Sequence, residues 1–245
     1  MSSIILDACN NHLGNTDIIR EMIKQAKTSG ADYIKFQAFD VEKLNMDEWG
    51  HRYDFYKSCQ LSDSQYAVIM SLCANVGIDP IFTVFHESVI ERLLYFNVKS
   101  VKIASPDADK FYLLEKVFEH FDNIFISCGM LTANNYKRLA KYLGIWKDKN
   151  IKLFYCVSKY PTTIKDINFG LMSLFDGFSD HTPSIDAAKT AIDRGMDYIE
   201  RHFTLGKFLP GPDHGFSSTP DEITELTFYR TYKDNIEKYK RRFYN

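Results

Sequence analysis

Two histidines near the C-terminal end of the chain, His181 and His202, are the residues whose type and spacing point most directly to chemistry. Each follows a short apolar run typical of a β-strand, in Phe-Ser-Asp-His-Thr and in Ile-Glu-Arg-His-Phe-Thr. Side chains two apart in a strand share a face, so Ser179 points with His181, and Glu200 with His202. On neighbouring parallel strands, two imidazoles and a carboxylate would converge as ligands for a divalent metal ion. A histidine packed and hydrogen-bonded in the core is the alternative, and the pairing favours metal ligation.

Two lysines, Lys35 and Lys102, lie inside predicted strands, in Ile-Lys-Phe-Gln and Val-Lys-Ile. Burying an unpaired ammonium group is costly, so both predict an anionic ligand in the mouth of a barrel. The alternative is a lysine that reaches solvent or pairs with a buried carboxylate. Hydroxyl groups follow other predicted strands, at Ser105, Ser127, Ser158 and Ser179. Two ammonium groups and several hydroxyls suit a ligand that carries a phosphate and a carboxylate.

Acidic residues near the same strand ends allow two interpretations. Asp7 ends the first predicted strand, where it is a candidate acid or base or a lysine counter-ion. Asp180 and Glu200 are candidates for contacts to the substrate or to the metal-ligating residues, or for ion pairs with Arg201 or a lysine. The stiff turn Leu-Pro-Gly-Pro-Asp-His either caps the barrel or holds Asp213 over its mouth.

Short apolar runs alternate with amphipathic stretches along the whole chain. The runs predict strands at Ile4–Asp7, Tyr33–Gln37, Pro80–Thr83, Val101–Ile103, Ile124–Ser127, Leu153–Cys156, Gly177–Ser179 and Tyr198–Glu200. The first helix is expected to begin at an N-cap Thr16 and to end before Gly30. Further helices are expected at Ser62–Asn75, Glu87–Phe96, Tyr112–Phe121, Ala133–Leu143, Ser184–Arg194 and Asp221–Phe243, with the weakest pattern at Asn168–Leu174. Eight such units in 245 residues predict an α/β fold, a single-domain (β/α)8 TIM barrel over residues 1–245.

The predicted barrel also places its polar residues where an active site belongs, at the C-terminal ends of the strands. In chain order these are Asp7, Lys35, Gln37, Thr83, Lys102, Ser105, Ser127, Ser158, Tyr160, Ser179, Asp180, His181, Glu200 and His202. The long connection Asp40–Leu61 is predicted to cover this end. It offers side chains for sugar contacts at Trp49, His51, Arg52 and Tyr53.

The composition excludes several classes of protein. A formal net charge of -2 argues against binding to nucleic acid or to a membrane surface. The chain has 5 cysteines and no Cys-x-x-Cys pair, which suits a reducing cytosol and argues against disulfides or structural zinc. No apolar run approaches the roughly 20 residues of a membrane span, and the N-terminus lacks the basic start of a signal peptide. We therefore expect a cytoplasmic protein that acts on small molecules.

Eight motifs in order resemble the sialic acid synthase (N-acetylneuraminate synthase) family. They are Asn-Asn-His-x-Gly, Gly-Ala-Asp-x-x-Lys-Phe-Gln, Lys-Ile-Ala-Ser, Ser-Cys-Gly-Met, Tyr-Pro-Thr, Ser-Asp-His-Thr, Glu-Arg-His-Phe-Thr and Gly-Pro-Asp-His, from Asn10 to His214. The resemblance implies a barrel that condenses phosphoenolpyruvate with an aldose, an amino sugar like N-acetylmannosamine. The product would be a nonulosonic acid, with release of phosphate.

The resemblance also implies roles for individual residues. The metal, Mn²⁺ or else Mg²⁺ or another divalent ion, would be held by His181 and His202. From their placement on adjacent strand ends, we expect these two to be the only direct protein ligands. The phosphoenolpyruvate pocket would comprise Lys35, Thr83, Lys102, Ser105, Ser127, Ser158 and Ser179. The acceptor sugar would lie near Gln37, Asp107, Tyr160, Asp213 and the metal. Asp7, Lys35 and Lys102 are the expected catalytic residues, with Glu200 near the substrate.

The chain departs from the family pattern at three places. The family's Ala-Glu-Ile-Gly after the first strand is Leu-Asp-Ala-Cys here, so that Asp7 is one methylene shorter than glutamate. The family's asparagine after the sixth strand is Ser158. Members usually carry a C-terminal antifreeze-like domain that reaches the sugar in a partner subunit, whereas this sequence stops at Asn245. We therefore expect a homo-oligomer, such as a dimer, or a separate protein to close the site.

Two other functions fit the sequence. The acceptor could be a different aldose, because the sugar-clamping domain is missing. The chain could also be a non-catalytic barrel subunit, an interpretation favoured by Asp7 and by the missing domain. The retention of both histidines and both lysines favours the enzyme.

Overall fold

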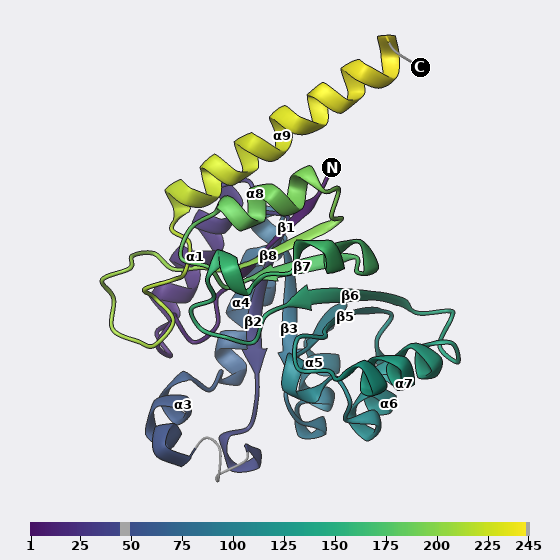
Figure 1. The fold of residues 1–245 in the computed structure, drawn as a ribbon. Helices are drawn as coiled ribbons and strands as arrows, with labels where there is room; N and C mark the ends of the chain where they lie inside the picture. Colours follow the sequence, from purple (N-terminus) through teal and green to yellow (C-terminus); the bar gives the residue numbers. More distant parts are fainter. Residues whose placement is uncertain (45–49, 244–245) are drawn as a thin grey trace.

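The structure is a computed structural model that describes residues 1–44 and 50–243. Its centre is a closed barrel of parallel strands that follow one another in sequence order, with β8 pairing back to β1. The strands are β1 (Ser3–Asp7), β2 (Tyr33–Ala38), β3 (Asp79–Val84), β4 (Ser100–Ile103), β5 (Asn123–Ser127), β6 (Asn150–Cys156), β7 (Gly177–Asp180) and β8 (Tyr198–His202). The predicted (β/α)8 TIM barrel is therefore confirmed (Figure 1).

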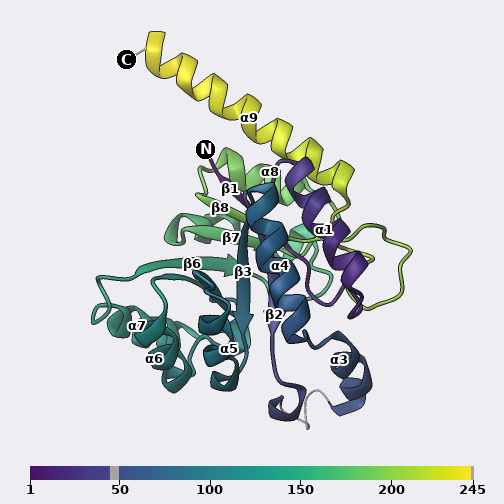
Figure 2. The same cartoon turned by 180° about the vertical axis from the view of Figure 1, so that it is seen from behind.

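Helices surround the barrel. They are α1 (Thr16–Thr28), α3 (Tyr53–Cys59), α4 (Asp63–Val76), α5 (Ile90–Tyr95), α6 (Phe111–His120), α7 (Ala133–Leu143), α8 (Asp186–Asp193) and α9 (Pro220–Phe243). Figure 2 shows α1 and α4 side by side against the barrel. Ser62 begins α4 with a capping box, because its hydroxyl accepts from the backbone of Gln65 while the Gln65 side chain binds back.

The alternation of side chains along β1 shows how the strands divide the core. Ile4 and Leu6 point outward into the large apolar layer between the strands and the helices. Ile5 points inward, where it belongs to a small cluster of buried side chains inside the barrel. Asp7 shares the inward face with Ile5 and pairs in register with Lys35 on β2 and with His202 on β8. The interior therefore changes from apolar to charged toward the C-terminal ends of the strands.

Two details of the predicted elements were wrong. Asn15, and not Thr16, is the N-cap of α1, because its side-chain oxygen accepts from the backbone N–H groups of Asp17 and Ile18. The segment before β7 forms 3-10 turns at Ile164–Asp166 and Phe169–Leu174 in place of the predicted α-helix, as short connecting segments often do. The connection after β2 contains α3 and is therefore partly helical.

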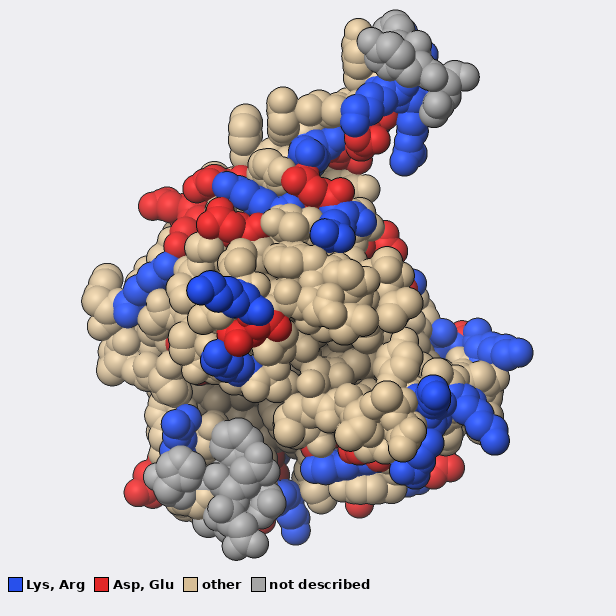
Figure 3. All heavy atoms as spheres, viewed as in Figure 1, with Lys and Arg blue, Asp and Glu red and all other residues tan. Residues whose placement is uncertain are grey.

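The last helix, α9, extends beyond the barrel. Its first half packs on α8 and α1, with Ile223 and Leu226 fully buried. Its second half projects away from the body of the molecule, where Tyr239 is exposed (Figures 1 and 2). Figure 3 shows basic and acidic side chains of both signs along this projecting part. Within the described residues, no helix has the length and apolar character needed to cross a membrane.

Gly14, in the loop between β1 and α1, allows the segment around Ser58 to pack closely. Its φ is +68°, and an added Cβ would lie 1.9 Å from the Ser58 carbonyl oxygen. Gly14→Ala is expected to lower the free energy of unfolding by about 3 kcal/mol or more, because backbone strain and overpacking add together. Gly195→Ala is the matched control, since its φ is +79° and nothing lies within 4 Å of the added Cβ.

The control substitution should cost only about 1–2 kcal/mol, the penalty of a left-handed backbone for a residue with a Cβ. Urea denaturation of both variants measures the difference. Equal losses of stability would contradict the close packing of the Gly14 loop against Ser58 of α3.

Candidate active site

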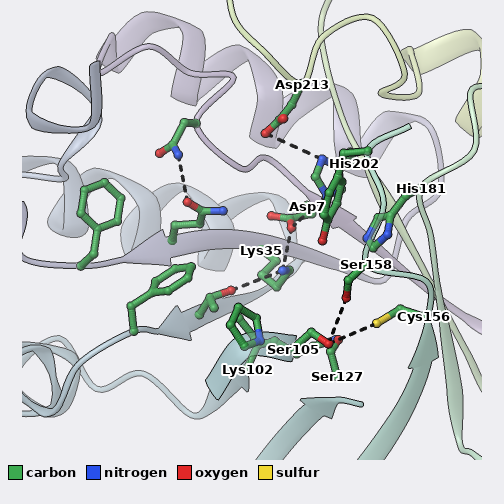
Figure 4. A pocket seen from close by; sticks show the side chains of 18 of the residues that line it. Asp7, Lys35, Lys102, Ser105, Ser127, Cys156, Ser158, His181, His202 and Asp213 are labelled. Carbon is green, nitrogen blue, oxygen red and sulfur yellow. Dashed lines mark hydrogen bonds and ion pairs between the residues drawn. The ribbon is translucent and has the colours of Figure 1, made fainter. Parts of the chain in front are cut away.

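A cavity of about 480 Å³ opens at the C-terminal ends of the strands. The predicted site residues that line it are Asp7, Lys35, Gln37, Thr83, Lys102, Ser105, Ser127, Ser158, Tyr160, His181, Glu200, His202 and Asp213. Figure 4 shows many of these side chains pointing into one volume from the ends of different strands. The structure therefore brings together residues separated by up to about two hundred positions in sequence, because a closed barrel places all strand ends on one rim.

Two lysines and two carboxylates form a buried charge network at the floor of this cavity. Lys35 Nζ lies 2.7 Å from Asp7 Oδ2 and 3.7 Å from Glu200 Oε1. Lys102 Nζ lies 3.0 Å from Glu200 Oε2 and 3.8 Å from the centre of the Phe154 ring. The counter-ion role that the sequence left open is therefore present for Asp7 and for Glu200. With two cations and two anions, the floor is neutral overall.

Burial and ion pairing set the protonation of this network. Burial would lower the pKa of Lys35, but the carboxylates of Asp7 and Glu200 outweigh it and raise that pKa. Burial lowers the pKa of Lys102, and Glu200 offsets part of this effect. Burial would raise the pKa of Glu200, but Lys102 and Lys35 overcome it and hold that pKa well below its usual range. Glu200 is thus an ionised carboxylate, and each lysine has an anionic partner.

Hydroxyl groups line the side of the cavity near β4 and β6. The Ser158 hydroxyl donates to Ser105 Oγ over 3.2 Å, and Ser105 Oγ accepts from the backbone N–H of Met130 over 2.8 Å. Thr83 Oγ1 accepts from Lys35 Nζ over 3.3 Å. These groups can turn their hydrogens toward an anionic ligand, because hydroxyl groups both donate and accept.

The two histidines lie next to each other, His181 directly after β7 and His202 at the end of β8, with ring centres 5.2 Å apart. His181 Nδ1 donates to the carbonyl oxygen of Val157 over 2.9 Å, since a carbonyl only accepts. This bond leaves the lone pair of His181 on Nε2, the arrangement typical of a metal-ligating histidine. The ring of Tyr160 packs 4.4 Å from that of His181.

Burial lowers the pKa of both imidazoles to about 4. For His181 the neighbouring His202 adds to the effect, whereas for His202 the Asp7 carboxylate opposes it. Both rings are therefore neutral at neutral pH, which is the form that binds a metal ion. The donor chemistry of the site fits a divalent cation.

Among the described residues, one group of three potential metal ligands lies close together. One atom each from Asp7, Cys9 and His202 lies within 4.8 Å of the others. His181 is outside this group, so its role as a ligand stays a prediction.

Asp213 reaches the cavity from the loop after β8, as the sequence predicted. Its Oδ2 lies 4.0 Å from His202 Nδ1 (Figure 4). Burial, together with the Asp7 carboxylate, raises the pKa of Asp213 to about 6. A contact between the end of β8 and the loop helps to hold the loop in place, since Thr204 Oγ1 lies 2.7 Å from His214 Nδ1.

Two predicted site residues do not line the cavity. Ser179 lies beneath it, where its hydroxyl donates to Glu200 Oε1 over 2.9 Å. Asp107 is buried on the 3-10 turn after β4, and it pairs with Lys110 over 2.6 Å. Asp180 also faces away from the ligand space, because it forms a buried ion pair with Arg201 at 2.8 Å. Ser179 therefore positions a carboxylate, and Asp107 needs a rearrangement to meet a ligand.

The segment after β2 covers one side of the cavity. Leu44, Arg52 and Tyr56 line it, so the predicted covering role of 40–61 is in part visible. Tyr53 points instead to Glu42, to which its hydroxyl donates. Trp49 and the side chain of His51 lie outside the described residues.

Comparisons with known proteins agree with this geometry. The sequence model of the NeuB family matches residues 22–237. The chain belongs to the NeuB family. An N,N'-diacetyllegionaminic acid synthase of Legionella pneumophila is 32% identical over 247 residues, which cover 91% of this chain and 69% of that protein. A protein of Methanocaldococcus jannaschii described as uncharacterized is 36% identical over 230 residues, covering 91% of this chain and 68% of its own.

A solved structure shows the same relationship. The N-acetylneuraminic acid synthetase of Leptospira borgpetersenii, crystallised with citrate, superposes with a TM-score of 0.90 at 26% identity, covering 96% of this chain and 84% of that one. The family resemblance seen in the motifs is confirmed. As a member of the NeuB family, the chain is an enzyme, a transferase of the sialic acid synthase type.

Sequence reasoning missed two polar residues of this NeuB site. Cys9 Sγ lies 3.0 Å from His202 Nδ1. In the sequence, this cysteine appears only as part of a motif that departs from the family pattern, and no role in the site was expected for it. Asn10 lines the cavity and donates to Gln37 Oε1 over 2.9 Å. No local pattern signalled Cys9, because β1 ends at Asp7 and Cys9 has a positive φ.

Proposed function

We propose that this chain catalyses the metal-dependent condensation of phosphoenolpyruvate with an aldose, giving a nonulosonic acid and phosphate. The observation that carries the proposal is that two neutral imidazoles and two buried ammonium groups line one cavity. An N-acetylmannosamine-like amino sugar is the acceptor that we favour. NeuB synthases as a family condense phosphoenolpyruvate with amino sugars, and the Legionella relative is named for a related acid.

Phosphoenolpyruvate would lie over Lys35 and Lys102. Each ammonium group has three donors, and the structure gives Lys102 one carboxylate partner, so donors remain for a ligand. Ser105, Ser127 and Ser158 would bind further anionic oxygens from the side of the cavity. These contacts would hold the enol carbon toward the histidines and exclude water from the reacting face.

The aldehyde group of the acceptor would lie near His181 and His202, which would hold the divalent ion. When bound, that ion would supply Lewis-acid polarisation of the carbonyl. Asp213, whose pKa burial and Asp7 raise to about 6, can hold or release a proton near neutral pH beside the acceptor. Gln37 and Tyr160 offer contacts to sugar hydroxyls from two sides of the cavity.

Phosphoenolpyruvate should bind without any acceptor, because the groups proposed to hold it belong to the strands and their ends. Lys102→Met keeps the apolar stem and removes the charge. It is expected to weaken binding roughly 10- to 150-fold, the value of a lost charge-assisted contact of about 1.5–3 kcal/mol. Isothermal titration calorimetry of both proteins measures the change. Lys116→Met, on the exposed surface of α6, should leave the affinity unchanged.

Phosphate release is the direct test of the reaction. The protein is mixed with phosphoenolpyruvate, a divalent ion and a panel of aldoses, with N-acetylmannosamine among them. Release that depends on both the metal and one aldose supports the proposal and identifies the acceptor. Binding of phosphoenolpyruvate without release for any aldose would contradict the proposed condensation.

The proposal includes a cytoplasmic location and a second subunit or a separate protein over the mouth of the barrel. All five cysteines are buried free thiols, as expected in a reducing compartment. The chain spans about two thirds of the length of the Methanocaldococcus and Legionella relatives, 68% and 69%. A covering partner would exclude water from the acceptor, which strengthens electrostatic interactions in the site.

A further inference from the structure

Cys9 occupies an unusual backbone position at the edge of the active site. Its φ is +46°, in the left-handed region where a residue with a Cβ is strained. The family motif Ala-Glu-Ile-Gly has glycine at the matching place, and glycine adopts such angles without strain. The chain therefore carries a thiol here at a cost in backbone free energy of about 1–3 kcal/mol. The thiol group is fully buried.

The thiol points at the group of potential metal ligands. Cys9 Sγ lies 3.0 Å from His202 Nδ1, and the Cys9 backbone N–H donates to Asp7 Oδ1 over 2.9 Å. Asp7 Oδ2 lies 3.9 Å from His202 Nε2. Donor atoms around a tetrahedral ion with bonds of about 2.0–2.3 Å are roughly 3.3–3.6 Å apart. The 3.0 Å between Cys9 Sγ and His202 Nδ1 is slightly below these values, and Asp7 Oδ2 lies nearest the other ring nitrogen. One donor atom from each of the three residues nevertheless lies within 4.8 Å of the others, so a modest approach of the side chains would complete the site.

We infer that the Cys9 thiolate is a direct ligand of the metal ion in this enzyme, together with His202 and Asp7. The inference extends the metal site of the proposed function and adds a ligand that the two-histidine arrangement lacks. A thiolate is a soft ligand that favours Zn²⁺, Co²⁺ and Fe²⁺, whereas Mg²⁺ and Mn²⁺ favour oxygen. The site should therefore prefer the softer ions. When the metal binds, the thiol releases its proton to solvent and the sulfur forms a bond to the metal.

Cobalt(II) tests the inference directly, because a thiolate bound to Co²⁺ gives an intense charge-transfer band in the near ultraviolet that nitrogen and oxygen ligands do not give. The metal-free protein is titrated with Co²⁺ in the absence of substrates. We expect the band for the parent protein and for Cys73→Ala, which removes a buried thiol from α4, away from the site. Cys9→Gly and Cys9→Ser should lose the band.

Affinity is the second measurement. Loss of a group that only hydrogen-bonds to a metal ligand lowers the metal affinity about 10- to 100-fold. Loss of Cys9, a direct ligand, should therefore weaken Zn²⁺ binding by at least about 100-fold. The affinity for Mn²⁺ should change less than for Zn²⁺. Cys9→Gly is suited to the backbone angle, and circular dichroism confirms that it folds. A parent protein without the band, or a Cys9→Gly protein that keeps it, would overturn the inference.

The test separates this inference from the proposed function. If the protein shows the cobalt band but releases no phosphate with any aldose, the thiolate ligand is supported and the condensation reaction is contradicted. If the protein condenses phosphoenolpyruvate with an aldose but shows no band, the reaction is supported and the thiolate ligand is contradicted.

Discussion

His202→Ala is expected to abolish the metal-dependent release of phosphate from phosphoenolpyruvate, with a loss of at least about a thousandfold. His202 ends β8 and lies near both His181 and Cys9. It is therefore a member of both candidate ligand sets, the histidine pair and the group of Asp7, Cys9 and His202. Lewis-acid stabilisation of a developing charge is worth several kcal/mol, and about 4 kcal/mol corresponds to a thousandfold in rate. Steady-state kinetics with saturating metal measures the loss.

His181→Ala should show the same loss if the histidine pair holds the ion. His120→Ala, at the exposed end of α6, is the control and should keep parent activity. Circular dichroism and metal titration of each variant show whether the fold is kept and the ion is lost. Near-parent activity together with parent metal affinity in His202→Ala would contradict the assignment.

Glu200→Gln is expected to lower the free energy of unfolding by about 3–5 kcal/mol, because it leaves buried ammonium groups without their shared counter-ion. Lys102 would lose its carboxylate at 3.0 Å, and Lys35 would keep only Asp7. The amide has nearly the same shape as the carboxylate, so the loss reports the charge. Urea denaturation at neutral pH measures it. A change below about 1 kcal/mol would show that the network is not held by Glu200.

Glu119→Gln is the matched control, because Glu119 Oε2 also lies 3.0 Å from a lysine, Lys116, but on the exposed surface of α6. An exposed pair of this kind is worth about 0–1 kcal/mol. The two substitutions therefore compare one ion-pair distance at two degrees of burial.

The difference in the free energy of unfolding between Glu200→Gln and the parent protein should shrink as the pH falls. Lys102 and Lys35 hold the folded-state pKa of Glu200 well below its value of about 4.3 in an unfolded chain, against the effect of burial. The stability that this group contributes is therefore fully present above about pH 4.3 and is lost as the pH falls toward the folded-state pKa. Unfolding curves below pH 4 should show the parent and the variant converging.

The sequence by itself determined the barrel and most of the membership of its site. Eight alternating units in one chain have few other ways to bury their apolar faces, and a parallel barrel places every strand end on one rim. Lys35, Lys102, His181 and His202 could therefore be assigned to one cavity from strand position. The family could be recognised as well, since motifs such as Ser-Asp-His-Thr depend on residue identity and order.

Tertiary structure decided which residues touch. Register placed Asp7 between Lys35 and His202, and closure of the barrel brought Glu200 of β8 against Lys102 of β4. The lysine charges that were predicted to bind an anion are therefore also paired with carboxylates. The positive φ of Cys9 turned its thiol toward His202, and a backbone angle is not encoded in any local pattern of apolar and polar residues. Contacts across the barrel depend on the distance between strands far apart in sequence. For that reason the thiol beside the histidine became visible only in the folded chain.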